Sequence, residues 1–463
     1  PFAPLNSAKI IIYFIFFQHR HYLLPVNPIK QRNCYKNPVH MNEEFLSYLW
    51  KYRQLDPDLV TESGEALTVL NPGEQNRDGG PDFFNARLRI GETTWAGNVE
   101  IHVCASHWFR HGHQHDHAYD NAILHVVYEN DQPVVLPNGM PLQTLVVRDR
   151  FPVRIFKRYQ LFMNNHQWIP CYNQLSPAAG DCLILWAPAL TMERLINKSL
   201  YIKQMWNGCR KDWEEAFYQH MASTFGFKIN SLPFELLAKS LPMKIVRRHT
   251  GDLLTMEALA FGQAGMLGRD FTEEYPRGLS QEYRYLQKKY SLTPITESTW
   301  KFLRLRPVNF PTLRISQWAC FLSSGDAAFS RVLEKTSCDE LSGSLQVSAS
   351  PYWDTHYTFE KTSAPRKKIL GRSCVDLMMI NGIAPFLFFY GLEKDEAVLR
   401  EKALDCLEKV RGEQNADVAH WQQTGLETGN ALRTQALIQL KRSYCDKRRC
   451  LDCQIGNALL STS

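Results

Sequence analysis

The spacing of apolar residues divides the chain into two parts. Between about residues 60 and 150, short runs rich in β-branched and aromatic residues alternate with turn-forming residues, which predicts a series of strands. We expect strands at "ALTVLNPG", "DFFNARLRI", "TTWAGNVEIHV" and "NAILHVVYEND", then a hairpin that turns at Asn138-Gly139. A short helix from Met41 to about Tyr52 precedes them, and one short helical piece lies near "HQHDHAYDNA".

From about residue 183 onward, helical periodicity replaces this alternation. Leu195, Ile202, Met205 and Trp213 fall near one stripe of a helix, while "LTMEALAFGQAGML" and "CVDLMMINGIAPFLFFYG" are almost wholly apolar. Such helices are expected inside a helical domain. The pattern predicts an α/β (α+β) domain at 41–165 and a larger, mainly α-helical domain at 180–463.

Composition agrees with a folded protein of this size. The chain has 463 residues, of which 44% are hydrophobic and 12% aromatic, enough for a large core and two domains. Its net charge of +6 permits an acidic partner such as DNA or RNA without requiring one. Most of the twelve cysteines stand singly in apolar surroundings, which is typical of reduced thiols in a cytoplasmic protein.

The first forty residues differ from the rest. No Met occurs before Met41, and the apolar core from Ile10 to Phe17 is too short to span a bilayer. We interpret 1–40 as an over-extended start or a disordered segment, and mass-spectrometric peptides from before Met41 in the native protein would contradict the first of these. Nothing in the remaining sequence indicates a membrane partner, and nothing indicates an oligomeric state.

The candidate chemistry lies on the second and third strands of this series. If "DFFNARLRI" and "TTWAGNVEIHV" pair as a hairpin, Asp82 at the start of one lies close to Glu100 near the end of the other. Glu100 and His102 share a face because they are two residues apart. Two carboxylates on adjacent strands suit Mg²⁺ or Mn²⁺, and His102 could assist an attacking water.

These residues carry a resemblance to a known superfamily. Pro81-Asp82, a spacer and then Glu100-Ile101-His102 resembles the PD-(D/E)XK nuclease superfamily, with His102 where Lys is usual. The resemblance implies a restriction-endonuclease-like core of helix, three antiparallel strands, helix and strand. It also implies that Asp82, Glu100 and the Ile101 carbonyl hold the metal. A neutral His lacks the fixed positive charge of Lys, which puts the usual mechanism in question.

A second resemblance covers most of the chain from Met41. The phrases "NRDGGPDFFNARL", "WAGNVEIHV", "YDNAILHVVYEND", "RPVNFPTLRISQWA" and "YCDKRRCLDCQIG" resemble an uncharacterised bacterial family, a domain of unknown function. This resemblance implies a bacterial cytoplasmic protein and no particular substrate. Asp82 could also merely cap a turn, and Glu100 and His102 could face solvent.

Seven of the fifteen histidines lie between His102 and His125. They could bind a transition metal, or they could belong to a solvated loop. We expect His113, His115 and His117 in the loop and His125 as a hydrogen-bonded core residue. The groups that directly follow the predicted site strand are expected to face substrate or support the site: His107, His111, Asp116 and Tyr119.

A separate array lies near the C-terminus. "YCDKRRCLDCQIG" contains Cys445, Cys450 and Cys453, a C-x₄-C-x₂-C spacing that indicates Zn²⁺ or an iron–sulfur cluster. A four-thiolate site needs one more ligand, for which Cys374 or a His is a candidate. A short helical tail with reduced thiols is the alternative.

Three functions remain open from the sequence. The first is a metal-dependent nuclease that hydrolyses phosphodiesters through Asp82, Glu100 and His102. The second is a nucleic-acid-binding or scaffold protein that keeps a nuclease-like fold without catalysis. The third is a hydrolase that uses a His-bound transition metal.

Overall fold

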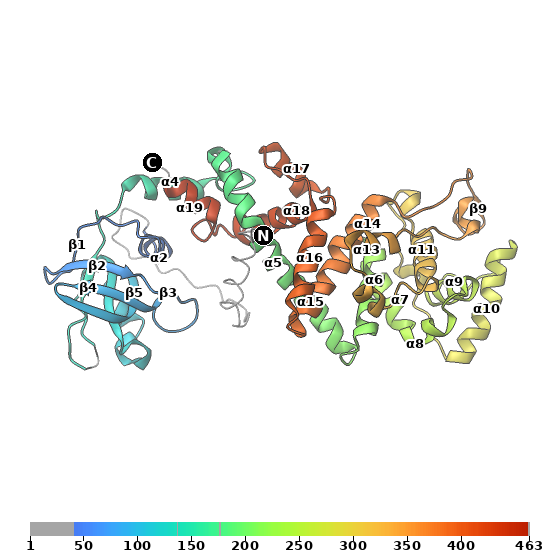
Figure 1. The fold of residues 1–463 in the computed structure, drawn as a ribbon, viewed down its shortest axis with the longest axis horizontal. Helices are drawn as coiled ribbons and strands as arrows, with labels where there is room; N and C mark the ends of the chain where they lie inside the picture. The colour runs from blue at the N-terminus through green and yellow to red at the C-terminus, as the bar shows by residue number, and fades with distance from the viewer. Residues whose placement is uncertain (1–40, 137, 176, 462–463) are drawn as a thin grey trace, which may run out of the picture. The chain divides into compact units, whose positions relative to one another are not determined.

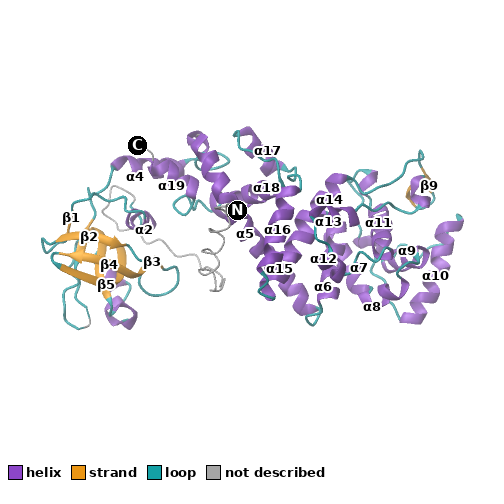
Figure 2. Ribbon diagram, in the orientation of Figure 1, coloured by secondary structure: helices purple, strands orange, loops and turns teal. Residues whose placement is uncertain are grey.

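The computed structural model describes residues 41–136, 138–175 and 177–461, and the segment interpreted above as an over-extended start lies outside them. The chain forms two compact units. The first contains the described residues up to Leu183 together with those from Arg442 onward, and the second spans Ile184–Lys441. Strands concentrate in the first unit, and helices make up nearly all of the second (Figures 1 and 2).

The first unit is built on a mixed sheet in the order β1-β2-β4-β5-β6-β7, with β3 paired to β4. Strands β2, β4 and β5 are antiparallel, whereas β6 runs parallel to both β5 and β7. The strands are β1 (Leu59–Val60), β2 (Ala66–Asn71), β3 (Glu74–Gln75), β4 (Phe83–Ile90), β5 (Thr93–Cys104), β6 (Ala122–Glu129) and β7 (Thr144–Val146).

The register of β4 and β5 follows from a tight turn and from alternation. Ile90 pairs with Thr93, and Gly91 between them has a φ of +55°, a conformation that favours glycine. Every second residue of β4 from Ala86 to Ile90 is buried. The second half of β5 is buried on both faces, because β6 continues the sheet and helical segments cover it.

Helix α2 (Glu43–Lys51) packs against β5. Asn42 caps its N-terminus by accepting a hydrogen bond from the Phe45 amide, and two glutamates follow in the first turn. Phe45 lies against Phe156 and Tyr159 of helix α4 (Val153–Asn164). The segment between β5 and β6 is less regular than a single helix. It consists of α3 (His107–Arg110), η1 (His113–His115) and η2 (His117–Tyr119).

The C-terminal segment joins the first unit, whereas we expected it in the helical domain. Long-range contacts explain the difference. The Tyr48 hydroxyl donates to Asn457 at 3.0 Å, and Arg77 pairs with Asp452. Helix α19 (Gln454–Ser461) packs against α4. The division at 41–165 and 180–463 therefore assigns the cysteine array to the wrong unit.

The second unit is helical, with one two-stranded ribbon of β8 (His356–Thr358) and β9 (Lys361–Thr362). Its longer helices are α5 (Pro177–Gly208, which begins in the first unit), α6 (Trp213–Phe225), α7 (Ser231–Ser240), α9 (Leu253–Gln263), α10 (Glu274–Tyr290), α11 (Pro311–Ser323), α15 (Ala384–Glu393), α16 (Ala397–Lys409), α17 (Ala416–Gln423) and α18 (Ala431–Leu440). Shorter helical segments are α8 (Met243–Val246), α12 (Phe329–Glu334), α13 (Cys338–Ser344), α14 (Arg372–Met378), η3 (Tyr172–Gln174, in the first unit), η4 (Arg247–His249), η5 (Glu297–Thr299), η6 (Pro307–Asn309), η7 (Pro351–Asp354), η8 (Met379–Ile383) and η9 (Lys441–Cys445, at the boundary of the two units).

One stretch of the second unit, Arg372–Glu393, is long and apolar enough to cross a membrane by length and composition. However, 78% of its most apolar window is buried within the protein, as expected for the core helix predicted at "CVDLMMINGIAPFLFFYG". Its π-helical turn Met379–Ile383 lies directly before Pro385, which has no N–H to continue the helical hydrogen bonds.

Candidate metal centre

Strands β4 and β5 bring Asp82 and Glu100 together. Phe83 pairs with Val99, so Asp82 lies beside the neighbouring residues of β5. The Asp82 amide donates to Glu100 Oε2 at 3.0 Å, and the Ile101 amide donates to Asp82 Oδ2 at 2.9 Å. Each carboxylate is therefore held by a backbone N–H of the opposite strand.

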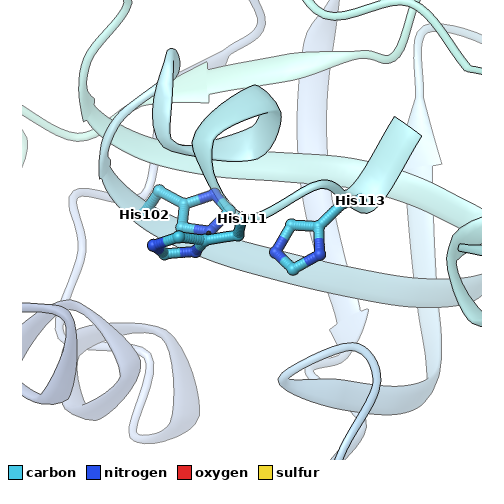
Figure 3. A group of neighbouring side chains, drawn as sticks. All are labelled: His102, His111 and His113. Atoms are coloured by element: carbon cyan, nitrogen blue, oxygen red, sulfur yellow. Dashed lines mark hydrogen bonds between the residues drawn. The ribbon is translucent and has the colours of Figure 1, made fainter. Parts of the chain in front are cut away.

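Three histidines, His102, His111 and His113, lie close together (Figure 3), and two of them approach Glu100. His102 follows Glu100 on the same face of β5, and its Nε2 lies 3.5 Å from Glu100 Oε1 and 3.1 Å from His111 Nδ1. His113 Nε2 lies 3.2 Å from the same Glu100 oxygen. One ligand nitrogen from each histidine lies within 4.8 Å of the other two.

These separations match those around a bound metal ion. Nitrogen and oxygen ligands at about 2.0–2.1 Å in tetrahedral geometry lie roughly 3.3–3.4 Å from one another. The adjacent pairs of candidate ligand atoms are 3.1, 3.2 and 3.5 Å apart. His113 Nε2 is buried and has no aligned hydrogen-bond partner, although Glu100 is close. His102, His111 and His113 could therefore hold one cation, with the Glu100 carboxylate near His102 and His113.

A buried histidine on the next strand orients His102. His125 is the register partner of Glu100 on β6 and is fully buried. Its Nε2 lies 2.8 Å from His102 Nδ1. When His102 carries its proton on Nδ1 and donates it to His125, the lone pair on Nε2 points to the cluster. Metal-ligating histidines commonly have such a partner on their second nitrogen.

Burial keeps the centre in uncharged forms when no cation is bound. Burial, followed by the proximity of the two carboxyls, raises the pKa of Asp82 to about 8. Burial likewise raises the pKa of Glu100 to about 8. Burial and neighbouring histidines lower the pKa of His102 well below its ordinary value and that of His125 to about 3. Neutral imidazoles can ligate a cation, and a cation would favour loss of the carboxyl protons.

The remaining predicted residues lie around this centre in different ways. His107 is buried with its Nδ1 3.3 Å from Glu43 of α2, and its ring lies 5.9 Å from that of His102. Tyr119 is buried and stacks on His113 with ring centroids 4.0 Å apart. Asp116 is exposed and caps η2 by accepting from the Ala118 amide, and its charge opposes the lowering of the His113 pKa by burial.

His113 was expected in a solvated loop, and this prediction is wrong. Gly112 adopts the left-handed conformation with a φ of +79°, and the chain turns there so that His111 and His113 both reach His102, while His113 also reaches Glu100. The two histidines that follow are exposed: the His117 side chain is 95% exposed and pairs with Asp120, and His115 also faces solvent. His125 is the hydrogen-bonded core residue that its apolar strand indicates.

A polar groove of about 570 Å³ is lined by residues of β4 and β5, the two strands that also carry the centre. Asn85, Arg87, Asn98 and Asn121 line it. The cluster itself is open to solvent at the exposed His111.

Comparison with known proteins identifies a family for the chain. A family model described as "Protein of unknown function (DUF2851)" matches residues 43–416. The chain belongs to this family. This confirms the expected membership in a family of unknown function. Neither a curated protein nor a solved structure matches the chain.

The DUF2851 match includes the whole candidate centre, from Glu43 of α2 to His125 of β6. It ends before the cysteine array at residues 445–453. The family description assigns no activity, so function must be inferred from the geometry of the centre.

Proposed function

We propose that this DUF2851 chain is a metal-dependent hydrolase that cleaves phosphodiesters in nucleic acid. The observation that carries the proposal is the cluster of Glu100, His102, His111 and His113, whose ligand atoms have metal-like spacing beside the buried carboxyl of Asp82.

The arrangement of elements supports a nuclease-like unit of restriction-endonuclease type. A helix, three antiparallel strands, short helical segments and a parallel strand follow one another as in the PD-(D/E)XK pattern, with Asp82 and Glu100 at the corresponding places. The short α3 and two 3₁₀ turns depart from that pattern, because a full helix is expected there.

The donor set changes the preferred cation. Carboxylates alone suit Mg²⁺, but imidazole nitrogens favour a transition metal. Three histidines whose ligand nitrogens lie within 4.8 Å of one another, with Glu100 near two of them, fit Zn²⁺ or Mn²⁺ better than Mg²⁺. The proposal therefore combines phosphodiester hydrolysis with a His-bound transition metal.

The residues take distinct roles in this proposal. A bound Zn²⁺ or Mn²⁺ would make water a better nucleophile by lowering its pKa and would polarise the phosphoryl oxygen. Glu100, His102, His111 and His113 hold the cation. His102 is occupied on both nitrogens, so it is a poor acceptor for the proton of the attacking water.

Asp82 is the better proton acceptor. Its carboxyl lies beside Glu100, and in the metal-free centre burial raises its pKa to about 8, well above the ordinary value of a carboxyl. A general base is most effective when its pKa lies near the working pH. We therefore assign the proton transfer to Asp82.

The groove beside the centre supports a nucleic-acid substrate. Arg87 can contact a phosphate, and the carboxamides of Asn85, Asn98 and Asn121 can hydrogen-bond sugars and base edges. These are the groups that contact the backbone and bases in protein–nucleic acid complexes.

The test uses the full chain, labelled single- and double-stranded DNA and RNA, and added Zn²⁺ or Mn²⁺. We expect cleavage that falls at least about 100-fold in Glu100→Gln and His113→Ala, which lose metal binding. The cleavage rate of Asp82→Asn should fall by about 10²–10⁴-fold, the usual contribution of a general base, while the metal stays bound. His117→Ala is the control, because its exposed side chain points away from the centre.

Each outcome has a clear meaning. Cleavage that is unchanged in Glu100→Gln, His113→Ala and Asp82→Asn would refute the proposed site. Tight binding of nucleic acid without cleavage under any metal condition would instead identify a non-catalytic nucleic-acid-binding protein.

A further inference from the structure

The segment that carries the C-terminal cysteines packs against the end of α4, and a fourth cysteine that is distant in sequence follows α4. Cys171 follows α4, whereas Cys450 and Cys453 lie just before α19, and all three are at most 9% exposed. All three carry thiols and none is in a disulfide. Cys445 precedes them at the end of the π-helical turn Lys441–Cys445.

Hydrogen bonds fasten the two segments that carry these cysteines. Arg448, which lies between Cys445 and Cys450, donates to the main-chain carbonyls of Phe162 and Met163 at the end of α4. It also donates to the Asn165 carbonyl at 3.0 Å. The Asn165 side chain in turn donates to the Pro170 carbonyl at 2.8 Å, directly before Cys171. One arginine therefore holds the array against the loop of Cys171.

The chain folds tightly around the last two cysteines. A Cβ at Gly456 would lie 2.1 Å from the Cys450 carbonyl oxygen, so only glycine permits this approach. The Asn457 amide donates to the Cys453 carbonyl at 2.8 Å as α19 begins.

The packing of the flanking helices agrees with these hydrogen bonds. Helix α19, which follows Cys453, packs against α4, which precedes Cys171. Cys171, Cys450 and Cys453 are all buried within the first unit and none is in a disulfide. Buried thiols of this kind form a soft-metal site once they lose their protons.

We propose that Cys171, Cys445, Cys450 and Cys453 form a four-thiolate site for a zinc ion or an iron–sulfur cluster, which fastens the C-terminal segment to the α/β unit. Both occupants require the same soft thiolate ligands. Arg448 and Arg449 beside the array supply positive charge that offsets the thiolates. This site is independent of the proposed hydrolase.

The earlier candidate for the fourth ligand is excluded by its location. Cys374 lies on α14 in the second unit and accepts a hydrogen bond from Arg314 at 3.3 Å. Cys171 is in the same unit as the array and occupies the place that Cys374 was expected to fill.

The experiment measures metal in the full-length chain, purified without oxygen and without a metal-affinity tag. Elemental analysis for zinc and iron, with visible absorption for a cluster, distinguishes the two occupants. In a His113→Ala background, in which the His centre is not loaded, we expect a stoichiometric zinc or cluster that falls at least about tenfold in Cys171→Ser and Cys453→Ser. Cys209→Ser, at a thiol in the second unit, should leave it unchanged.

A second measurement applies if the variants do not fold. Cobalt(II) bound to the metal-stripped wild type should show sulfur-to-cobalt charge-transfer absorption, and X-ray absorption should show sulfur ligands. Wild-type protein that contains neither zinc nor iron and gives no sulfur ligation of cobalt would overturn the proposal. A folded Cys171→Ser variant that keeps its full metal content would overturn the assignment of the fourth ligand.

Discussion

Replacing His125 tests whether the buried hydrogen bond to His102 supports a metal site. His125→Phe keeps an aromatic ring in a fully buried position but removes the Nε2 atom that lies 2.8 Å from His102 Nδ1. His102 Nδ1 then loses its partner inside the protein. His102 can rotate or carry its proton on Nε2, and either change makes it a poorer ligand.

The expected loss of metal affinity can be worked out in two ways. Removing the partner of a metal-ligating histidine typically lowers metal affinity by about 10–100-fold, which is about 1.4–2.7 kcal/mol. Leaving a buried donor without an acceptor costs about 1–3 kcal/mol. The two ranges agree, so we expect Zn²⁺ or Mn²⁺ to bind about 10–100-fold more weakly to His125→Phe.

The assay is competition with a chelator of known affinity at fixed pH, with circular dichroism to confirm folding. His220→Phe is the matched control: His220 is also buried, bonds through Nε2 to the Gly382 carbonyl, and lies in the second unit. It should lose stability but keep its metal affinity at the centre. A change of less than twofold in folded His125→Phe would refute the role of this hydrogen bond.

Three further predictions concern pH, the helical core and the loop. Because burial raises the pKa of Asp82 from 3.8 to about 8, its protonated form stabilises the metal-free fold below pH 4, and this contribution is lost as the pH rises to about 8. The free energy of unfolding of the metal-free wild type, measured with a chemical denaturant, should therefore fall more steeply across pH 4–8 than that of Asp82→Asn. Parallel curves for the two proteins would contradict the raised pKa of Asp82. Trp353→Ala removes a fully buried side chain and should lower the free energy of unfolding by about 3–5 kcal/mol in urea titration, whereas a loss below about 1 kcal/mol would contradict its burial. His117→Ala should change neither metal affinity nor stability by more than about 0.5 kcal/mol, and a larger loss would place His117 in the centre.

The parts of the site that depend on local pattern could be predicted from the sequence. Alternation along β4 and β5 and the turn at Gly91 bring Asp82 near Glu100, although a bulge between Phe83 and Ala86 shifts the pairing by one residue. The two-residue spacing likewise places Glu100 and His102 on one face. The all-apolar run around Pro385 indicates a core helix, as observed.

The rest depends on features that no short pattern contains. His113 joins the cluster because Gly112 takes a positive φ, and glycine permits that conformation without requiring it. The segment around Cys450 joins the first unit through contacts such as Tyr48 to Asn457, which are 409 residues apart in sequence. Cys171 could therefore not be matched with the array from spacing alone.

The most direct test of the account is an anomalous-diffraction map from crystals of the full chain soaked in Zn²⁺ or Mn²⁺. The account predicts one peak about 2.0–2.3 Å from Glu100 Oε1, His102 Nε2, His111 Nδ1 and His113 Nε2. A map at full soaking that shows no peak among these four atoms would contradict the metal centre and, with it, the proposed hydrolase.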